Sequence, residues 1–99
     1  MIIDLLTNQA NGNGDAVGSN ADSVGSTPDP GTLAYYGTWD SATAKVQLSP
    51  DGGTTWIDIP SSSATANTAL NLTAKRGFTY RGVVSGGGGS ESINVKWAQ

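Results

Sequence analysis

Hydrophobic and polar residues alternate most regularly in the stretch 44–59, on both sides of a turn sequence of proline, aspartate and two glycines (50–53). Successive side chains of a β-strand point to opposite faces, so Val46 and Leu48 share one face and the polar residues beside them share the other. The Asp51 side chain can accept hydrogen bonds from the turn, and a glycine can supply the positive φ that closes it. The stretch therefore predicts a β-hairpin.

Short alternating runs recur along the rest of the chain at the roughly ten-residue spacing of small antiparallel folds. About seven or eight such strands predict an all-β fold, a single antiparallel β-sandwich or jelly-roll-like domain over residues 1–99. A short helix over 67–74 is the weaker alternative for that run, because threonine and asparagine fill most of its remaining positions. Besides the two strands within 44–59, we expect strands at 1–6, 32–39, 67–74, 78–85 and 91–97.

The alternation also predicts which side chains share a face of each strand. In the last strand we expect Ile93, Val95 and Trp97 to point inward and the polar residues between them to point outward. The other groups that share a face are Leu33 with Tyr35, Ala34 with Tyr36, Leu70 with Leu72 and Ala74, Phe78 with Tyr80, and Arg81 with Val83.

The N-terminal third leaves alternatives open. Residues 1–6 are apolar apart from Asp4 and predict a strand within the domain; the alternative is an arm that orders only against a neighbouring subunit. Residues 1–31 together form a polar segment rich in glycine and asparagine. Loops as long as 8–31 are uncommon inside compact domains, so we expect one or two short edge strands near 15–20 and 22–25, with an extended arm as the alternative.

The remaining connections are predicted from turn-forming residues. Asp40-Ser41 and the Lys-Arg-Gly sequence at 75–77 read as turns, and 60–64 as a serine-rich loop. Residues 86–89 are four consecutive glycines, which predict a flexible hairpin loop between the strands 78–85 and 91–97.

Composition narrows the classes of function. Hydrophobic residues make up 36% of the 99 residues and charged residues 13%, while the net charge is −3 with no basic stripe, which argues against a nucleic-acid partner. The chain has no cysteine and no histidine, and histidine is the commonest general base and metal ligand. No apolar run is long enough to span a membrane or to act as a signal peptide. A thin core without disulfides or metals favours stabilisation by oligomerisation.

Two constellations of acidic residues and amides were weighed for chemistry. Residues 11–22 resemble a calcium loop faintly, with Asn11, Asn13, Asp15 and Asp22 at ligand positions, but Ala16 stands where glycine is needed and no helix flanks the loop, so we expect no metal site. A carboxylate pair could act as acid and base, but nothing in the spacing brings any two together, so we expect no enzyme activity and no cofactor. The carboxylates considered are Asp40, Asp51, Asp58 and Glu91.

The aromatic residues allow two readings. They could form a platform for sugars, but core and subunit-interface packing is the simpler expectation, because few large aliphatic residues are available. Likewise Lys75, Arg76 and Arg81 could form a cationic patch with Tyr80, although charges at turns are the simpler reading. The aromatic set is Tyr35, Tyr36, Trp39, Trp56 and Trp97, and the candidate interface residues are Tyr35, Tyr36, Trp39, Ile2, Ile3 and Leu5.

The turn of the hairpin carries a recognisable motif, Ser-x-Asp-x-Gly-x-Thr-Trp, formed by Ser49, Asp51, Gly53, Thr55 and Trp56. It resembles the Asp-box, a hairpin motif of sialidase propellers and of many unrelated secreted and viral proteins. In those families the motif is a fold element away from the active site. A propeller would repeat it in each blade, whereas this chain contains it once, so the resemblance implies a structural role.

A wider pattern resembles a group of small tailed-phage virion proteins. Its residues are Tyr36-Gly37-Thr38-Trp39, the Asp-box-like turn, Tyr80-Arg81, the glycine-rich turn and Asn94-Val95-Lys96-Trp97. Proteins of this kind resemble capsid decoration (cement) proteins and small fibre or tail components. The resemblance implies a β-sandwich that assembles, often as a trimer, on a shell of coat proteins.

The leading hypothesis is therefore a non-enzymatic structural virion protein that binds the major capsid protein and its own copies, with a homotrimer favoured. Such a protein would be made in the host cytoplasm and would end on the capsid surface. The rival hypothesis is a carbohydrate-binding sandwich of a phage tail, a fibre or a secreted protein that uses Tyr35, Tyr36 or Trp39. A glycan-cleaving enzyme fragment is the weakest of the three.

Overall fold

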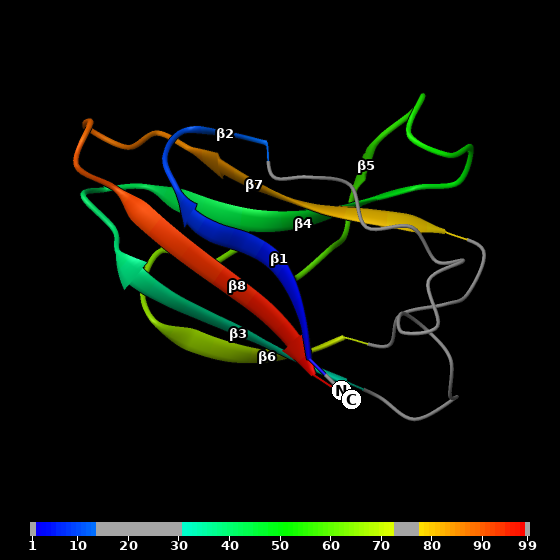
Figure 1. Ribbon diagram of the computed structural model, residues 1–99, viewed down its shortest axis with the longest axis horizontal. Coiled ribbons are helices and arrows are strands. Elements are labelled where there is room, and N and C mark those ends of the chain that lie inside the picture. Colours follow the sequence, from blue (N-terminus) through cyan, green and yellow to red (C-terminus); the bar gives the residue numbers. More distant parts are fainter. Residues whose placement is uncertain (1, 14–30, 73–77, 99) are drawn as a thin grey trace.

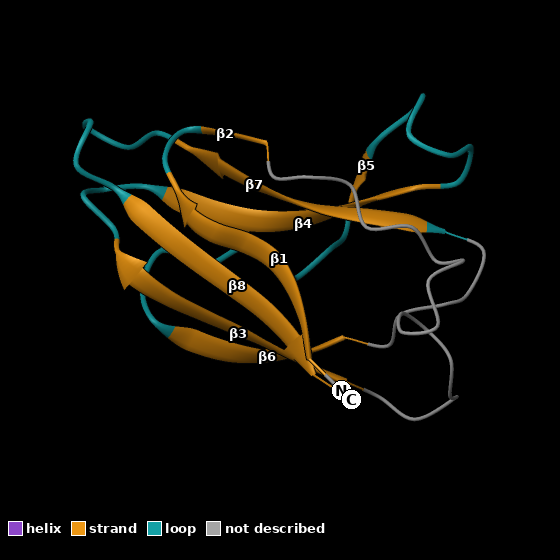
Figure 2. Cartoon of the chain, viewed as in Figure 1, coloured by secondary structure: helices purple, strands orange, loops and turns teal. Residues whose placement is uncertain are grey.

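The computed structural model describes residues 2–13, 31–72 and 78–98. These residues form eight strands and no helix (Figure 2). The prediction of an all-β chain is therefore confirmed. The strands are β1 (Ile2–Gln9), β2 (Gly12–Asn13), β3 (Gly31–Thr38), β4 (Thr43–Ser49), β5 (Ile57–Asp58), β6 (Thr68–Leu72), β7 (Thr79–Ser85) and β8 (Ser92–Ala98).

The strands form two four-stranded antiparallel sheets that face each other as two layers (Figure 1). The β8 sheet has the order β1-β8-β3-β6, and the β4 sheet has the order β2-β7-β4-β5. The pairs β1–β8, β2–β7, β3–β6 and β4–β5 are nested one inside the next, as in one long hairpin that has been rolled up. Rolling a nested hairpin into two sheets gives the jelly roll, so the predicted sandwich is confirmed with this topology.

The core lies between the sheets and follows the predicted alternation. In β8, Ile93, Val95 and Trp97 are buried, and in β3, Leu33 and Tyr35 are buried. The two-residue period of a strand thus places its apolar side chains on the inner face. The other buried hydrophobic residues are Leu5, Leu6, Ala42, Ala44, Val46, Ala64, Tyr80 and Val84.

Two aromatic side chains of the core also bind the connecting segments. Trp97 Nε1 donates a hydrogen bond to the Leu72 carbonyl at 2.9 Å. The Tyr35 hydroxyl donates to the Ser62 carbonyl, and burial raises the pKa of Tyr35 well above its usual range. Buried tyrosine and tryptophan need such partners because an unpaired polar group is costly in a low dielectric. Tyr35 therefore fixes the path of the segment after β5, and Trp97 binds the end of β6, while both side chains fill the core.

The N-terminal residues form a strand within the domain rather than an arm. β1 pairs with β8 from Ile2 opposite Ala98 to Gln9 opposite Ile93. The register shifts on both sides of Leu6, and Leu5 and Leu6 are consecutive yet both buried. A regular strand would turn one of them to solvent, so the irregularity brings both into the core.

Other local predictions have mixed outcomes. The strand predicted at 67–74 is confirmed by β6, and the alternative of a helix there is wrong. The glycine sequence 86–89 is not a hairpin loop, because it joins β7 of one sheet to β8 of the other. Asp40 and Ser41 form the predicted turn, with φ of 42° and 66°. The edge strands predicted near 15–20 and 22–25, Ala74 and the turn at 75–77 lie outside the described residues.

The two sheets approach each other closely at Gly82 of β7. A Cβ atom at this position would lie 2.4 Å from Cγ of Leu6, which is itself buried. Real Cβ atoms do not approach other carbon atoms this closely, and Leu6 is held by the irregular part of β1. Gly82 therefore sets the spacing between β1 and β7.

We expect Gly82→Ala to destabilise the domain by about 1–3 kcal/mol, because the added methyl group overpacks the core beside Leu6. Denaturant unfolding followed by tryptophan fluorescence measures this change. Ser85→Ala, on an exposed position of the same strand, is the control and should change stability by less than about 0.5 kcal/mol. Equal stability of the two variants would contradict the assignment.

Candidate functional site

The turn between β4 and β5 is closed by side chains of the Asp-box-like motif. Ser49 is fully buried at the end of β4, and its hydroxyl donates to Asp51 Oδ1 at 2.7 Å and accepts from the Gly53 N–H at 2.8 Å. Asp51 Oδ1 also accepts from the N–H groups of Thr55 and Thr54, at 2.7 and 3.2 Å. The hairpin predicted at 44–59 is confirmed, and the motif residues make the hydrogen bonds of its turn.

The glycines and the carboxylate of this turn behave as the sequence predicts. Gly52 and Gly53 have φ of 77° and 109°, a region of backbone conformation that residues other than glycine rarely adopt. Hydrogen bonds from Thr55 and then from Ser49 lower the pKa of Asp51 to about 2. Because these donors belong to the turn itself, the Asp51 carboxylate stabilises the turn.

Trp56, the last residue of the motif, joins a row of polar side chains on the outer face of the β4 sheet. The Arg81 guanidinium lies over its indole ring, 4.2 Å from the ring centre. Arg81 Nε donates to Gln47 Oε1 at 2.8 Å, and Gln47 Nε2 donates to Asp58 Oδ1 at 2.7 Å. Lys45 completes the row with a 2.9 Å ion pair to Asp58 Oδ2. We call these five residues the outer network.

The outer network follows from the strand register. Gln47 of β4 lies opposite Asp58 of β5 on one side and opposite Arg81 of β7 on the other. Opposite residues of an antiparallel pair share a face, so the three side chains form a continuous row. Hydrogen bonds from Gln47 first, and then from Lys45, lower the pKa of Asp58. Asp58 is exposed and the other four residues are half-buried, and the polar groups of the network are paired to one another.

Tyr80 does not join Arg81 in the cationic patch that the sequence offers as the weaker alternative. Tyr80 is buried, on the opposite face of β7 from Arg81, so it cannot contribute to an exposed patch beside that residue. Lys75 and Arg76 lie outside the described residues. The aromatic partner of Arg81 is instead Trp56. Sequence reasoning missed this contact, because it depends on which strands are neighbours in the sheet.

Two carboxylates hold the loop of residues 86–90 in place. Asp40 Oδ2 accepts from the Ser90 N–H at 2.9 Å. Glu91 is 6% exposed; its Oε1 accepts from the Gly89 N–H at 2.7 Å and its Oε2 from the Asn11 N–H at 3.2 Å. These backbone bonds, chiefly that from Gly89, lower the pKa of Glu91. Both side chains are engaged by the loop's backbone.

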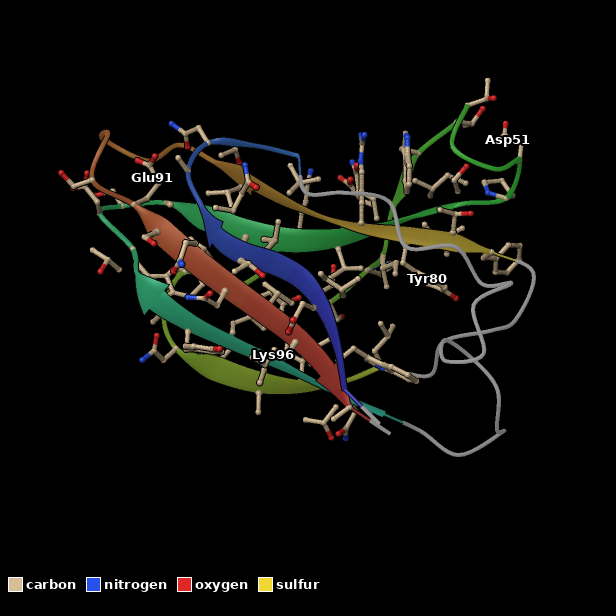
Figure 3. All side chains as sticks on the ribbon, in the orientation of Figure 1. Asp51, Tyr80, Glu91 and Lys96 are labelled. Carbon is tan, nitrogen blue, oxygen red and sulfur yellow. The ribbon has the colours of Figure 1, made fainter. Side chains whose placement is uncertain are left out.

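The four candidate carboxylates are thus divided between two regions. Figure 3 shows Asp51 and Glu91 at opposite ends of the domain. Asp58 belongs with Asp51 to the β4–β5 hairpin, and Asp40 bonds the same loop as Glu91. The structure therefore does not bring the four together, and each of them accepts hydrogen bonds from its own surroundings.

Asn11, the first residue of the calcium-loop-like sequence, uses its side-chain amide to bind the backbone of Gly87. Its amide Nδ2 donates to the Gly87 carbonyl at 3.1 Å, and its Oδ1 accepts from the Gly87 N–H at 2.9 Å. Asp15 and Asp22 lie outside the described residues. Within the described ranges, no group of three or more histidine, cysteine, aspartate or glutamate residues is placed to hold a metal ion. The same residues contain no helix that is long and apolar enough to cross a membrane.

The aromatic residues do not form one platform. Tyr35 and Trp97 are buried in the core, whereas Tyr36 is 39% exposed on the outer face of the β8 sheet. Trp39 is half-buried, and its Nε1 donates to Asn67 Oδ1 at 2.8 Å. Trp56 lies on the other sheet with Arg81. Only Tyr36, Trp39 and Trp56 of the five are accessible.

The candidate interface residues therefore need correction. Leu5 and Tyr35 face the core, where a partner would not reach their side chains. Tyr36 is exposed and Trp39 half-buried, which leaves both available for contact. Ile2 and Ile3 belong to β1, but their side chains lie outside the described part of the structure.

Comparison with known proteins gives no relative: no protein-family model, no curated protein and no solved structure matches this chain.

We expect the stability of the domain to decrease as the pH falls from about 4 to about 2. The pKa of Asp51 is about 2 in the folded chain against 3.8 ordinarily, so its charged form stabilises the fold above the ordinary value and this contribution disappears as the pH falls through the folded value. Glu91 and Asp58, whose pKa values are also lowered, contribute in the same direction.

Thermal unfolding of the wild type and of Asp51→Asn across this pH range tests the assignment. The variant should melt several degrees lower at neutral pH, because the turn loses a charged acceptor. It should also show a shallower decline below about pH 4. Melting curves of the variant that parallel those of the wild type at every pH would contradict a role of Asp51 in the turn.

Proposed function

We propose that this chain is a non-enzymatic structural protein of a tailed-phage virion, which binds the major capsid protein on the capsid surface and associates with copies of itself. The observation that carries the proposal is the jelly-roll strand order, a topology used by viral capsid and lectin domains. The resemblance of the motif-bearing strands to small virion proteins supports the same reading. The proposed function involves no nucleic acid, membrane or cofactor.

The use of the acidic side chains supports a structural rather than a catalytic role. Asp51 closes a turn, Glu91 and Asp40 hold a loop, and Asp58 pairs with Lys45. A general acid or base must have a proton free to exchange with a substrate, and its pKa is typically tuned toward the working pH. The pKa values of Asp51, Asp58 and Glu91 are instead lowered by bonds within the fold.

The outer face of the β8 sheet suits a contact between proteins. On this face Ala34 of β3 lies between Ala69 of β6 and Lys96 of β8, so two small side chains adjoin one long one. Tyr36 projects from the same face and is 39% exposed. Aromatic residues are enriched at the energetically important positions of interfaces. We assign the contact between copies in a homotrimer to this face, with Tyr36 as its anchor.

Light scattering at micromolar concentration tests the oligomer. The expected particle has three times the 10.0 kDa mass of the chain, and Tyr36→Ala should shift it toward the monomer, because truncation of an aromatic anchor removes much of the binding energy. Thr54→Ala, in the exposed turn, is the matched control and should leave the mass unchanged. Co-sedimentation with empty capsids tests the second partner. A stable monomer that binds no capsid would sink the proposal.

We also expect no catalytic activity. A screen against glycosides, peptides and esters should return background rates, because the accessible carboxylates are engaged in turns and ion pairs. Turnover that is lost specifically in Asp58→Asn or Glu91→Gln, in protein that melts like the wild type, would overturn this expectation.

A carbohydrate-binding module is the second candidate. The half-buried Trp56 is linked through Arg81, which lies over its ring, to the amide of Gln47 and the carboxylate of Asp58, and ligand sites combine aromatic and hydrogen-bonding groups in this way. A glycan-array signal that disappears in Trp56→Ala would favour this candidate over the virion protein.

A further inference from the structure

The outermost strands of the two sheets differ in how they are protected against pairing with another chain. In the β4 sheet, the edge strand β5 has only two residues. After β5 the chain continues along β4, where the Ile59 N–H donates to the Val46 carbonyl at 3.1 Å and Ala64 bridges Ala44. Very short and covered edges offer little backbone to a partner.

The edge strand β1 of the β8 sheet is protected in another way. Its register with β8 shifts twice, and Asp4 carries a charge on the strand, paired with Lys96 at 2.7 Å. Irregular strands and charged side chains are the features by which natural sheets prevent edge-to-edge association.

β6, the other edge of the β8 sheet, has none of these features (Figure 1). Its five residues contain no charge and no proline, and its pairing with β3 runs from Gly31 opposite Leu72 to Tyr35 opposite Thr68 without a shift in register. Thr68, Ala69 and Asn71 are exposed. Among the residues that the structure describes, β3 is the one strand paired with β6. Within the described ranges, the outer edge of β6 therefore presents regular backbone that no other strand pairs with.

We propose that β6 pairs in antiparallel register with β6 of a second copy of this chain, with Leu70 opposite Leu70. The two β8 sheets then join into one continuous sheet across a two-fold axis. This contact is isologous, so it links copies in pairs and is distinct from the trimer contact assigned to Tyr36.

The sequence of β6 fits its own copy in this register. Thr68 lies opposite Leu72 of the second copy, on the same face as the two Leu70 side chains, and Ala69 lies opposite Asn71 on the other face. Leu70 and Leu72 are half-buried in the single chain, so pairing covers apolar surface that is still exposed. The chain carries a net charge of −3, yet no like charges meet in this contact.

The length of β6 determines how strong the contact is. A pair of five-residue strands buries much less than the roughly 1,200 Å² of a standard interface, so it gives weak association in dilute solution. Copies held side by side on a surface would pair at a high effective concentration. The β6 contact therefore rests on the proposed function, because attachment to a shell supplies the high effective concentration at which the weak contact forms.

A cysteine cross-link tests the register directly. The chain has no cysteine, so Leu70→Cys introduces a single thiol that faces its counterpart across the two-fold axis. Opposite Cα atoms of an antiparallel pair lie about 4.5–5.5 Å apart, which is within the range that a disulfide spans. Under mild oxidation this variant should form covalent dimers faster than Thr54→Cys, whose thiol lies in the exposed turn. Equal rates in the two variants would overturn the proposed register.

A charge pair tests the contact without altering the half-buried face. In A69K/N71K each lysine of one strand faces a lysine of the other, which should weaken self-association by about tenfold. In sedimentation equilibrium the wild-type mass should double from that of the trimer as the concentration rises, whereas A69K/N71K should keep the mass of the trimer at every concentration. Retention of the trimer mass shows that the variant leaves intact the contact assigned to Tyr36, whose face Ala69 shares. Mixing A69K/N71K with A69D/N71D should restore the doubling. T7K/S85K, at exposed positions of β1 and β7, is the matched control and should behave like the wild type.

The outcomes separate this inference from the proposed function. A wild-type mass that is independent of concentration, or doubling that persists in A69K/N71K, overturns the pairing of β6 with a second copy. If A69K/N71K in addition fails to bind capsids, the edge accepts a strand of the coat protein instead. Capsid binding by the wild type without any doubling leaves the proposed function standing, and doubling without capsid binding leaves the β6 contact standing.

Discussion

The hydrogen bonds that Asp51 and Ser49 form within the β4–β5 turn are the constraint on which the rest of the fold depends. This turn is the tip of the nested hairpin, and the pairs β3–β6, β2–β7 and β1–β8 enclose it in succession. Because a slip of one residue would exchange the two faces of a strand, the register set at the tip helps to decide which side chains of β4 face the core. Buried Ser49 joins the turn to that core.

The connections between the sheets are held by polar groups as well as by the apolar side chains, such as Ala42 and Ala64, that they contribute to the core. Tyr35 binds the segment after β5 through the Ser62 carbonyl, and Ser62 itself bonds the Val46 backbone through its hydroxyl. Glu91 and Asp40 hold the glycine loop in a similar way. A jelly roll needs several long crossings between layers, and a core with few large aliphatic residues gives them little to pack against. The hydrogen bonds of these side chains therefore add to the packing that holds the connections.

The local pattern of hydrophobic and polar residues predicted the strands well, but it did not predict which strands are neighbours in a sheet. Alternation identified the inner faces of β3 and β8, and the turn residues located the hairpin, because both signals are contained in a few consecutive residues. The glycine sequence 86–89 was misread as a hairpin loop, since its neighbours along the chain belong to different sheets. The contact of Arg81 with Trp56 was missed for the same reason. Tyr35 was assigned to an interface because composition alone does not distinguish a core aromatic residue from an exposed one.

The pairing of Ile2 with Ala98 has a consequence for how the domain is made. β1 cannot pair with β8 until β8 has left the ribosome. The hydrophobic residues of β1 therefore have no partner strand while nearly all of the domain is being synthesised. Sheets dominated by such distant pairings fold slowly, in milliseconds to seconds. The chain must lose the entropy of closing a large loop before the contacts between the distant strands can stabilise it. During that interval β1 is a target for chaperones and for the wrong partner strand. The yield of folded protein in a cell should then depend on the rate of synthesis as well as on final stability.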